Sequence, residues 1–526
     1  MTGVPRLGVG IGLVGRRREL AALGAALDRA AAGRAGGVLL SGDAGVGKSR
    51  LAAEARARAA AAGFTVLTGR CLDAAESALP YLPFAEIAGQ LAATRPELLD
   101  THAELRRLLP GGGTVAGAPE DRELGQLRVF DAVLSALQEL AARTPVLLVV
   151  EDLHWADRSS RDLLVFLLSR LTGQRLVVLA TYRTDDLHRR HPLRPVLSEL
   201  VRLPAVERVD LVPLDAEEAV ELVRRLADGS LPEPLITGVA RRSEGNAFFA
   251  EELVSACSDG LPHGLVEVLL ARVERLSPAT QKVLRTASVA GRRVRHDRLA
   301  AVSGLPVDEL EQALREAVTH HVLVAGEPGR GEVGDSYAFR HALLREAIYH
   351  ELLPGERIRL HSAYARVLAD RPDEPGAAAE IAHHAMAALD LPAALAASVR
   401  AAREADDREA RPEMLLHTER AIELWAAVPD AEAVAGVDEI TLTRWAAWGA
   451  SVTGDPDRGV ALARRALELA EERGEPRLSS SIGRRYALRL LDLVGREREA
   501  LAAAERALEP IAGEPPSADL AWGHAV

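Results

Sequence analysis

The sequence predicts a multi-domain fold: an α/β P-loop domain with a parallel sheet and a helical lid, then a winged helix, then all-α tetratricopeptide-like helical repeats. Three observations predict this order. A glycine-rich loop at residues 42–49 lies between an apolar run and a helical segment. Further short apolar runs lack polar alternation, which is typical of strands buried on both faces of a parallel sheet. Beyond residue 356 the pattern is helical, and 526 residues suffice for three or four domains.

The glycine-rich loop has the spacing G-x-x-x-x-G-K-S of a phosphate-binding loop. Residues 37–41 before it read as a buried strand, and residues 50–62 after it read as a helix. Its backbone N–H groups and the start of the helix would bind phosphate, with Lys48 on the β- and γ-phosphates and Ser49 on Mg²⁺. An ordinary glycine-rich turn is the alternative. The loop consists of Gly42, Asp43, Ala44, Gly45, Val46, Gly47, Lys48 and Ser49.

Lysine is rare in this chain, which makes the lysine of the loop informative. Lys48 and Lys282 are the two lysines, and nearly every other cationic residue is arginine. A lysine is a compact point charge and an arginine a flat fork, so the two do not replace each other in a phosphate cradle. The residue type at position 48 therefore favours nucleotide binding over a structural turn.

The apolar run at residues 146–150 ends in two acids, Glu151 and Asp152. Carboxylates at the C-terminal end of a parallel strand lie where open α/β sheets bind their ligands. In this Walker B arrangement one acid would hold the Mg²⁺ shell and the other would orient or deprotonate the attacking water. The sequence leaves open which acid faces the metal, and a strand end capped by solvated acids is the alternative.

The remaining strands are expected at residues 64–68, 176–180 and 206–211. The strand at 176–180 leads to Arg183, which we expect to project toward the γ-phosphate and sense it. The alternative is a surface arginine paired with Asp185 or Asp186. Residues 215–227 begin the helical lid, and Asp215 is the expected N-cap.

Residues 264–340 read as a winged helix, with helices expected at 264–276, 277–290, 297–303 and 306–320 and a wing at 322–339. A winged helix often reads DNA through a late helix. Here that helix carries four acids against one arginine, so phosphates would repel it. We therefore expect an intramolecular packing domain and no direct DNA binding. The charged residues are Asp308, Glu309, Glu311, Glu316 and Arg315.

The C-terminal helical region contains a repeated motif of the type Arg-Ala-x-Glu. Its arginines, Arg420, Arg465 and Arg506, lie 45 and 41 residues apart. This spacing predicts helical hairpins near the tetratricopeptide class, which stack to form a curved binding surface. An unknown inducer or protein partner would bind there. The alternative is alanine-rich helix without a ligand.

Composition excludes several classes of protein. The net charge of −12 gives no general attraction to nucleic acid. Two cysteines make neither a disulfide framework nor a zinc cluster, which fits a reducing, cytoplasmic location. No apolar stretch is long enough to span a membrane, so no membrane association is expected.

These motifs together resemble the large ATP-binding regulators of the LuxR family, which belong to the STAND class of P-loop ATPases with an origin-recognition-like AAA module. The stretch D-L-H-W-A-D at residues 152–157 is the most specific match. Ala247 stands where the family usually has proline. The remaining matches are residues 13–16, the P-loop, and residues 181–183, 241–249, 339–347 and 357–361.

The resemblance implies ATP or ADP with Mg²⁺ as ligands, slow ATP hydrolysis and an ATP-dependent oligomer. It also adds nucleotide-contacting residues to the loop: Val14, Gly15, Arg16, Arg50 and His341. His341 would contact a phosphate in a closed, ADP-bound state. A histidine packed at a helix start near Arg345 and Glu346 is the equal alternative.

The expected domain limits are a tail at 1–12, the ATPase domain with its lid at 13–258, the winged helix at 259–355 and the repeats at 356–526. Family members continue with further repeats and a C-terminal helix-turn-helix. We therefore expect a fragment, a truncated product, or a regulator without its own DNA-binding domain. The leading hypothesis is an ATP-dependent signalling switch. Its rivals are a constitutive ATPase or regulatory part of a nucleotide cyclase, and a DNA-binding AAA protein of the replication-initiator type.

Overall fold

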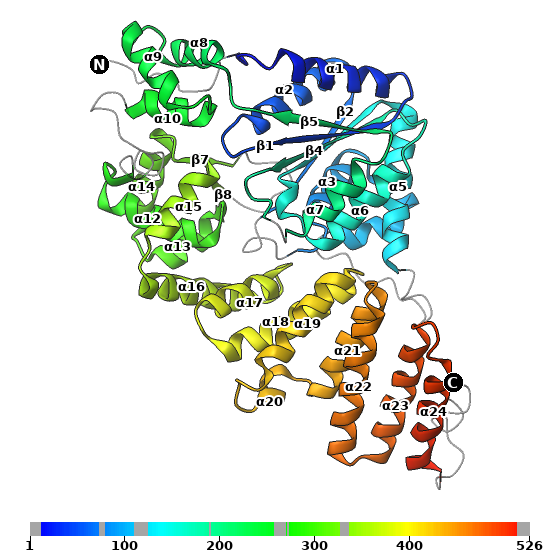
Figure 1. Ribbon diagram of the computed structural model, residues 1–526. Coiled ribbons are helices and arrows are strands. Elements are labelled where there is room, and N and C mark those ends of the chain that lie inside the picture. The colour runs from blue at the N-terminus through cyan, green and yellow to red at the C-terminus, as the bar shows by residue number, and fades with distance from the viewer. Residues whose placement is uncertain are drawn as a thin grey trace. The chain divides into compact units, whose positions relative to one another are not determined.

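The computed structural model describes residues 12–72, 79–109, 125–188, 191–256, 270, 273–326 and 336–512. The chain divides into two compact units, one running to Leu360 apart from short segments and one beginning at His361. Figure 1 shows the helices and strands of both units. Most of the expected tail, part of the first winged-helix helix and of the wing, and the last residues of the chain lie outside the described residues.

The first unit contains a five-stranded parallel sheet in the order β2-β3-β4-β1-β5 (Figure 1). Every residue of β3 and β4 is buried, as expected for the centre of such a sheet, whereas β5 lies at the edge and alternates buried and exposed residues near its end. This confirms the predicted parallel-sheet P-loop fold. The strands are β1 (Gly36–Gly42), β2 (Thr65–Arg70), β3 (Val146–Glu151), β4 (Leu176–Arg183) and β5 (Val206–Leu211).

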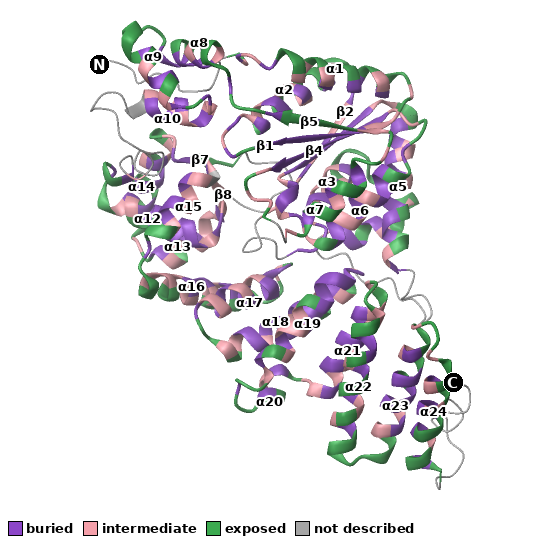
Figure 2. Cartoon of the chain, in the orientation of Figure 1, coloured by how far each residue is buried: buried purple, intermediate pink, exposed green. Residues whose placement is uncertain are grey.

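Helices cover both faces of this sheet. On one face, α1 (Arg17–Ala31) and α2 (Lys48–Ala61) bury Leu27 and Leu51 against Val38 and Leu40 of β1. The other face carries helices that follow β2, β3 and β4 (Figures 1 and 2). These and the short elements around them are α3 (Leu82–Thr94), α4 (Pro96–Thr101), η1 (Ala103–Leu108), α5 (Gly125–Arg143), η3 (Leu153–Trp155), α6 (Arg158–Ser169) and α7 (Leu193–Leu200).

The lid consists of α8 (Ala216–Ala227), α9 (Glu233–Arg242) and α10 (Ala247–Ala256). Asp215 is the N-cap of α8, as predicted, and accepts a hydrogen bond from the N–H of Glu218 at 2.8 Å. The Glu218 side chain in turn accepts from the N–H of Asp215, which completes a capping box. The lid has its own apolar core, into which Val14 packs from the start of the described chain.

A module of helices and a small antiparallel sheet follows the lid and agrees with the predicted winged helix. The sheet order is β6-β8-β7. Ser277 caps the first helix, α12, by accepting from the N–H of Thr280. The elements are α12 (Pro278–Ala290), β6 (Arg293–Arg295), α13 (His296–Ser303), α14 (Val307–Thr319), β7 (Leu323–Ala325), β8 (Ser336–Phe339) and α15 (Ala342–Glu351), followed by α16 (Pro354–Ala369).

The second unit is helical throughout its described part, in agreement with the prediction. Its helices pack as antiparallel hairpins, α18 with α19, α21 with α22 and α23 with α24. Arg420, Arg465 and Arg506 lie on the second helix of these hairpins. The elements are α17 (Ala377–Ala387), α18 (Leu391–Asp407), α19 (Arg411–Trp425), α20 (Ala431–Ala435), α21 (Glu439–Val452), α22 (Pro456–Arg473), α23 (Pro476–Leu491), α24 (Glu497–Leu508) and η4 (Glu509–Ile511).

Candidate functional site

The glycine-rich loop joins β1 to α2 and turns through glycines at positive φ. Gly42, Gly45 and Gly47 have φ of 150°, 80° and 110°, a region that side chains rarely adopt. Lys48 is buried, and its Nζ donates to the carbonyls of Gly42 and Asp43, both at 2.7 Å. The loop thus holds its lysine folded back onto the loop's own carbonyls.

A cavity of about 300 Å³ lies against this loop. It brings together the loop, the end of β3, the end of β4, the lid and the winged-helix module, all within the first unit. Its lining includes most of the predicted site residues. The lining residues are Ala44, Gly45, Gly47, Lys48, Ser49, Arg50, Asp152, Arg183, Leu222, Ala247, Phe248, Glu251, Arg292, Arg340, His341 and Leu343.

The lid holds the loop through Asn246, a contact that sequence reasoning did not assign. Asn246 Nδ2 donates to the carbonyl of Ala44 at 2.9 Å, and its Oδ1 accepts from the N–H of Phe249 at 3.2 Å. The N–H of Phe248 donates to the carbonyl of Gly45 at 3.1 Å. The motif at residues 241–249 was the available signal, but its distance of about two hundred positions from the loop hid the contact.

Replacing Gly45 with alanine is expected to destabilise the first unit by about 1–3 kcal/mol and to weaken nucleotide binding. A Cβ at this position would lie 2.6 Å from Asn246 Oδ1 and 2.9 Å from Phe248 Cβ, at a φ of +80°. The matched control is Gly24→Ala on α1, where a Cβ meets nothing within 4 Å. That change should stabilise by up to about 1 kcal/mol. Equal thermal unfolding midpoints for the two variants would contradict the lid contact.

The two Walker B acids are separated by the structure. Asp152, in left-handed conformation with φ 58°, faces the cavity, and its N–H donates to Thr181 Oγ1 at 3.0 Å. Glu151 lies apart from the cavity lining: its carboxylate pairs with Arg70 Nε at 2.8 Å and Arg56 Nη1 at 3.7 Å. Of the two acids, Asp152 is the one that lines the cavity together with the glycine-rich loop.

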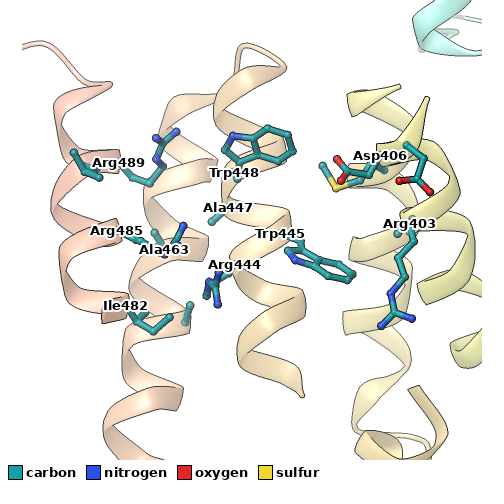
Figure 3. Close-up of a pocket in the computed structure, with 15 residues that line it drawn as sticks. Arg403, Asp406, Arg444, Trp445, Ala447, Trp448, Ala463, Ile482, Arg485 and Arg489 are labelled. Atoms are coloured by element: carbon teal, nitrogen blue, oxygen red, sulfur yellow. The ribbon is translucent and has the colours of Figure 1, made fainter. Parts of the chain in front are cut away.

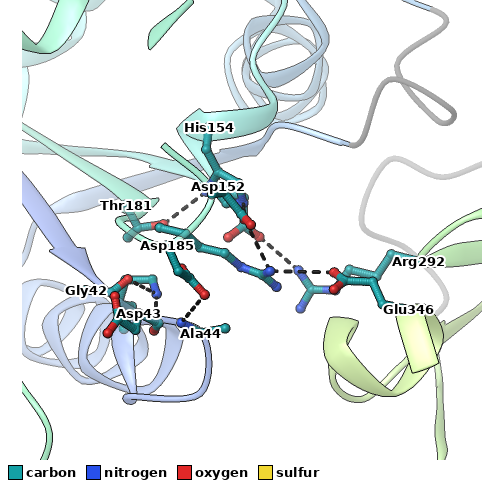
Figure 4. Close-up of polar contacts among 12 residues, drawn as sticks. Gly42, Asp43, Ala44, Asp152, His154, Thr181, Asp185, Arg292 and Glu346 are labelled. Atoms are coloured by element: carbon teal, nitrogen blue, oxygen red, sulfur yellow. Dashed lines mark hydrogen bonds and ion pairs between the residues drawn. The ribbon is translucent and has the colours of Figure 1, made fainter. Parts of the chain in front are cut away.

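The winged-helix module reaches into the cavity with two charged side chains. Arg292 Nη1 donates to Asp152 Oδ2 at 2.8 Å (Figure 4). Glu346 Oε1 lies 3.6 Å from Nη1 of Arg183. Both the predicted metal-binding acid and the predicted phosphate sensor are therefore engaged by this module.

Arg183 combines features of both predicted alternatives. It lines the cavity and is buried, and its guanidinium lies 5.3 Å from the ring centre of Trp155. Its Nη1 also donates to Asp186 Oδ2 at 3.3 Å. Asp185, the other predicted partner, instead accepts from the backbone N–H of Ala44 in the loop at 3.2 Å (Figure 4). An acid thus occupies a backbone donor that a phosphate would use.

Burial and the nearby Arg183 lower the pKa of Lys48 to about 8. A bound phosphate would favour the charged amine, so nucleotide binding above this pH takes up a proton. We expect ADP affinity to be constant below pH 8 and to fall by up to about tenfold per pH unit above it. Titration of ADP at pH 7, 8 and 9 measures this pH dependence. The variant Lys282→Ala, which removes an exposed lysine, should show the same dependence of ADP affinity on pH as the wild type. A flat profile to pH 9 would contradict the assignment.

Other residues of the D-L-H-W-A-D stretch support the site rather than line it. His154 is buried beside Asp152, and burial lowers its pKa to about 3, so it is neutral at physiological pH. Asp157 is the N-cap of α6 and accepts from the N–H of Ser160 at 2.8 Å. The stretch thus positions Asp152 between a strand end and a capped helix.

Residues at the start of the domain lie behind the loop and outside the cavity lining. Arg16 Nη2 donates to the carbonyl of Val46 at 3.1 Å. Gly15 has φ 64°, a backbone conformation that favours glycine, and packs against the Glu218 carboxylate. With Val14 in the lid core, this segment joins the lid to the loop. Arg50 does line the cavity, and its Nη1 lies 3.8 Å from Glu251 Oε1 on α10.

His341 lines the cavity from the winged-helix side. Its ring packs on Phe248 of the lid, with ring centroids 3.9 Å apart. The winged-helix module also contributes Arg292, Arg340 and Leu343 to the lining. A nucleotide in this cavity would be enclosed by three parts of the unit: the loop, the lid and the winged-helix module.

Comparison with known proteins finds one matching domain family and one similar protein. Residues 12–179 match the AAA ATPase domain family. An uncharacterized protein of Rhizobium meliloti (strain 1021) is 29% identical over 479 residues, which are 82% of this chain; the chain spans 44% of that protein's length.

None of the described helices is long and apolar enough to cross a membrane.

Solved structures include similar chains. A signal transduction ATPase with numerous domains, with a tetratricopeptide repeat sensor, from Pyrococcus horikoshii matches 99% of this chain and 73% of its own, at 17% identity and a TM-score of 0.49. AMPPCP-bound DnaA from Aquifex aeolicus matches 59% of this chain and 87% of its own, at 13% identity and a TM-score of 0.29.

Proposed function

We propose that this chain is an ATP-binding signal-transduction switch of the LuxR regulator type, in which the bound nucleotide controls how the winged-helix module packs on the ATPase domain. One observation carries the proposal. The module's Arg292 and Glu346 pair with Asp152 and Arg183, the two side chains that a γ-phosphate and its Mg²⁺ would need. Docking of the module and full engagement of a triphosphate thus compete for the same groups.

The residues at the cavity fit an adenine nucleotide with Mg²⁺. The loop supplies backbone N–H groups and Lys48, and the Ser49 hydroxyl and the Asp152 carboxylate are the oxygen ligands that Mg²⁺ prefers. The ion would neutralise charge on the β- and γ-phosphates. Arg183 would hold the terminal phosphate, and Glu151, with its two arginines, would fix the strand end that carries Asp152.

The proposed docked form binds ADP, because the diphosphate contacts the loop and leaves Arg183 and Asp152 to the winged-helix module. With ATP, Arg183 would hold the terminal phosphate and Asp152 would serve as a ligand of the metal, so both ion pairs with the module would break. Moving a two-state equilibrium from nearly all docked to nearly all released requires about 5.5 kcal/mol of differential binding. Two partly buried, charged contacts are able to supply a substantial share of this.

The output of the switch is proposed to be contact with a protein partner or a second copy of the chain, rather than direct DNA binding. Helix α14 exposes Asp308, Glu309 and Glu311, which phosphates would repel. Glu316 is engaged at the start of α12, where its Oε1 accepts from the N–H of Ser277 at 3.2 Å. The input is proposed to be a ligand or partner on the helical repeats.

Two matched substitutions test the metal assignment. Asp152→Asn should abolish most of the gain in ATP affinity that Mg²⁺ confers, since a neutral amide is a poor ligand for the ion. Glu151→Gln should keep that gain, because the Glu151 carboxylate faces Arg56 and Arg70. Calorimetric titration of ATP with and without Mg²⁺ measures both. The reverse pattern would move the metal site to Glu151.

A further inference from the structure

A second cavity, of about 600 Å³, lies within the helical unit (Figure 3). It is formed by successive hairpins and is lined chiefly by α18, α21 and α23. Its volume is that of a pocket for a small molecule. The lining residues are Ala402, Arg403, Asp406, Asp407, Met414, Arg444, Trp445, Ala447, Trp448, Ala463, Ala466, Ile482, Arg485, Leu488 and Arg489.

Three arginines line this cavity from three successive hairpins, and Arg444 and Arg485 occupy equivalent places in theirs. Arg403, Arg444 and Arg485 follow one another at intervals of 41 residues and lie on the first helix of each hairpin, α18, α21 and α23. Stacked repeats bring equivalent positions onto the same face, which places Arg444 and Arg485 together. Arg403 lies on the other side of the tryptophans of α21, so the three arginines form a row of like charges across the pocket, to which α23 adds Arg489.

The central arginine of this row has no ion pair or hydrogen bond among the residues that the structure describes. Its Nε is fully buried. Burial and the charge of Arg485 lower the pKa of Arg444, and the acid that partly offsets them, Asp438, is paired with Arg473 at 2.7 Å. Burial, with the charges of Arg484 and Arg489, lowers the pKa of Arg485 as well. A half-buried guanidinium without a partner is costly for the fold, and a bound anion would offset that cost.

The acids in the pocket do not neutralise this row. Asp406 pairs with Arg411, whose guanidinium lies 4.4 Å from the ring centre of Trp448. Arg489 is held by Asp492 at 3.0 Å. Asp407 lines the pocket from the last residue of α18, whereas Arg444 and Arg485 belong to α21 and α23. Excess positive charge therefore remains at Arg444 and Arg485.

Two tryptophans of α21 stand next to these charges. Trp445 and Trp448 lie one helical turn apart, and Figure 3 shows both facing the pocket with Arg444, Arg485 and Arg489 on one side and Arg403 and Asp406 on the other. Arg403 lies 5.7 Å from the ring centre of Trp445. Indole faces pack well against a planar ring, and arginine forks bind carboxylate, sulfonate or phosphate groups.

We propose that this pocket binds a small planar aromatic molecule that carries at least two negative charges. Its ring packs on Trp445 and Trp448, and its anionic groups accept hydrogen bonds from Arg444 and Arg485. That this ligand is the input of the switch rests on the proposed function. The binding itself does not, because every residue involved belongs to the helical unit.

The test uses naphthalene-1,5-disulfonate as the probe and naphthalene-1,5-diol as its uncharged counterpart. Isothermal titration of the full chain should show saturable binding of the disulfonate and at least tenfold weaker binding of the diol. Arg444→Gln and Arg485→Gln should each lower the affinity for the disulfonate at least about tenfold. Arg465→Gln, an exposed arginine of α22 outside the pocket, is the control with the same change in charge and should bind as the wild type does.

Further measurements distinguish a failure of this ligand proposal from a folding defect and from a failure of the proposed function. The thermal midpoint of Arg444→Gln should equal or exceed that of the wild type, because an unpaired, half-buried charge is removed. Lys48→Ala should bind the disulfonate normally, whatever its nucleotide affinity. Equal binding of the diol, an unchanged affinity in Arg444→Gln, or tight binding of an acidic peptide in place of the disulfonate would overturn the proposal.

Discussion

Replacing Lys48 with alanine is expected to lower the affinity for ATP and ADP by about a hundredfold or more. Nζ of Lys48 makes two 2.7 Å hydrogen bonds to loop carbonyls, which the proposal exchanges for β- and γ-phosphate oxygens. Each charge-assisted hydrogen bond to such a group contributes about 1.5–3 kcal/mol, so losing two corresponds to at least two orders of magnitude. The variant should fold, since it removes a buried charge that desolvation already disfavours.

The chain provides a matched control for this substitution. Lys282 is the second lysine of the sequence and is exposed on α12. Titration of a fluorescent ADP analogue should give the wild-type affinity for Lys282→Ala and little binding for Lys48→Ala. If both variants bind as the wild type does, the glycine-rich loop is a structural turn and the proposed nucleotide site is wrong.

Replacing Arg292 with alanine is expected to speed ADP release by about tenfold and to raise ATP turnover. Its guanidinium is the winged-helix group that donates to Asp152 at 2.8 Å. A charged hydrogen bond of this kind contributes about 1.5–3 kcal/mol, which corresponds to tenfold or more in the docking equilibrium. Without it the module should leave the cavity more often, and ADP should dissociate through the open form.

The control for Arg292→Ala is Arg315→Ala, an exposed arginine on α14 of the same module. Stopped-flow chase of bound ADP should show wild-type release from this control. Glu346→Gln removes the second contact, the one with Arg183 at 3.6 Å, and should also speed release. The free-energy effect of the double variant should be smaller than the sum of the two single effects, because both substitutions disrupt the same docked state. Slower release in Arg292→Ala would refute the docking mechanism.

The elements were predictable where local pattern decides them. Continuous apolar runs located β3 and β4, because a strand covered on both faces has no solvent side to mark with polar residues. Spacing alone located the glycine-rich loop, and the acid at position 215 marked the start of α8. In each case the physical cause lies within a few residues of its effect.

The contacts that define the site were not predictable in the same way. Glu151 and Asp152 are adjacent in sequence, yet only the packing of Arg56 and Arg70 shows that Glu151 turns away from the cavity. Arg292 and Glu346 come from a module that follows the lid, so no local pattern connects them to the loop. Arg444 and Arg485 did carry a signal, because their interval of 41 residues equals that between Arg465 and Arg506 of the repeated motif.

The measurement that tests the central claim most directly is the identity of the bound nucleotide together with the rate of turnover. The purified chain is denatured, the released nucleotide is identified, and ATP hydrolysis is followed beside Lys48→Ala. The account predicts tightly held ADP and slow turnover in the wild type, and neither in the variant. An empty site with rapid, repeated turnover would contradict the switch and identify a constitutive ATPase.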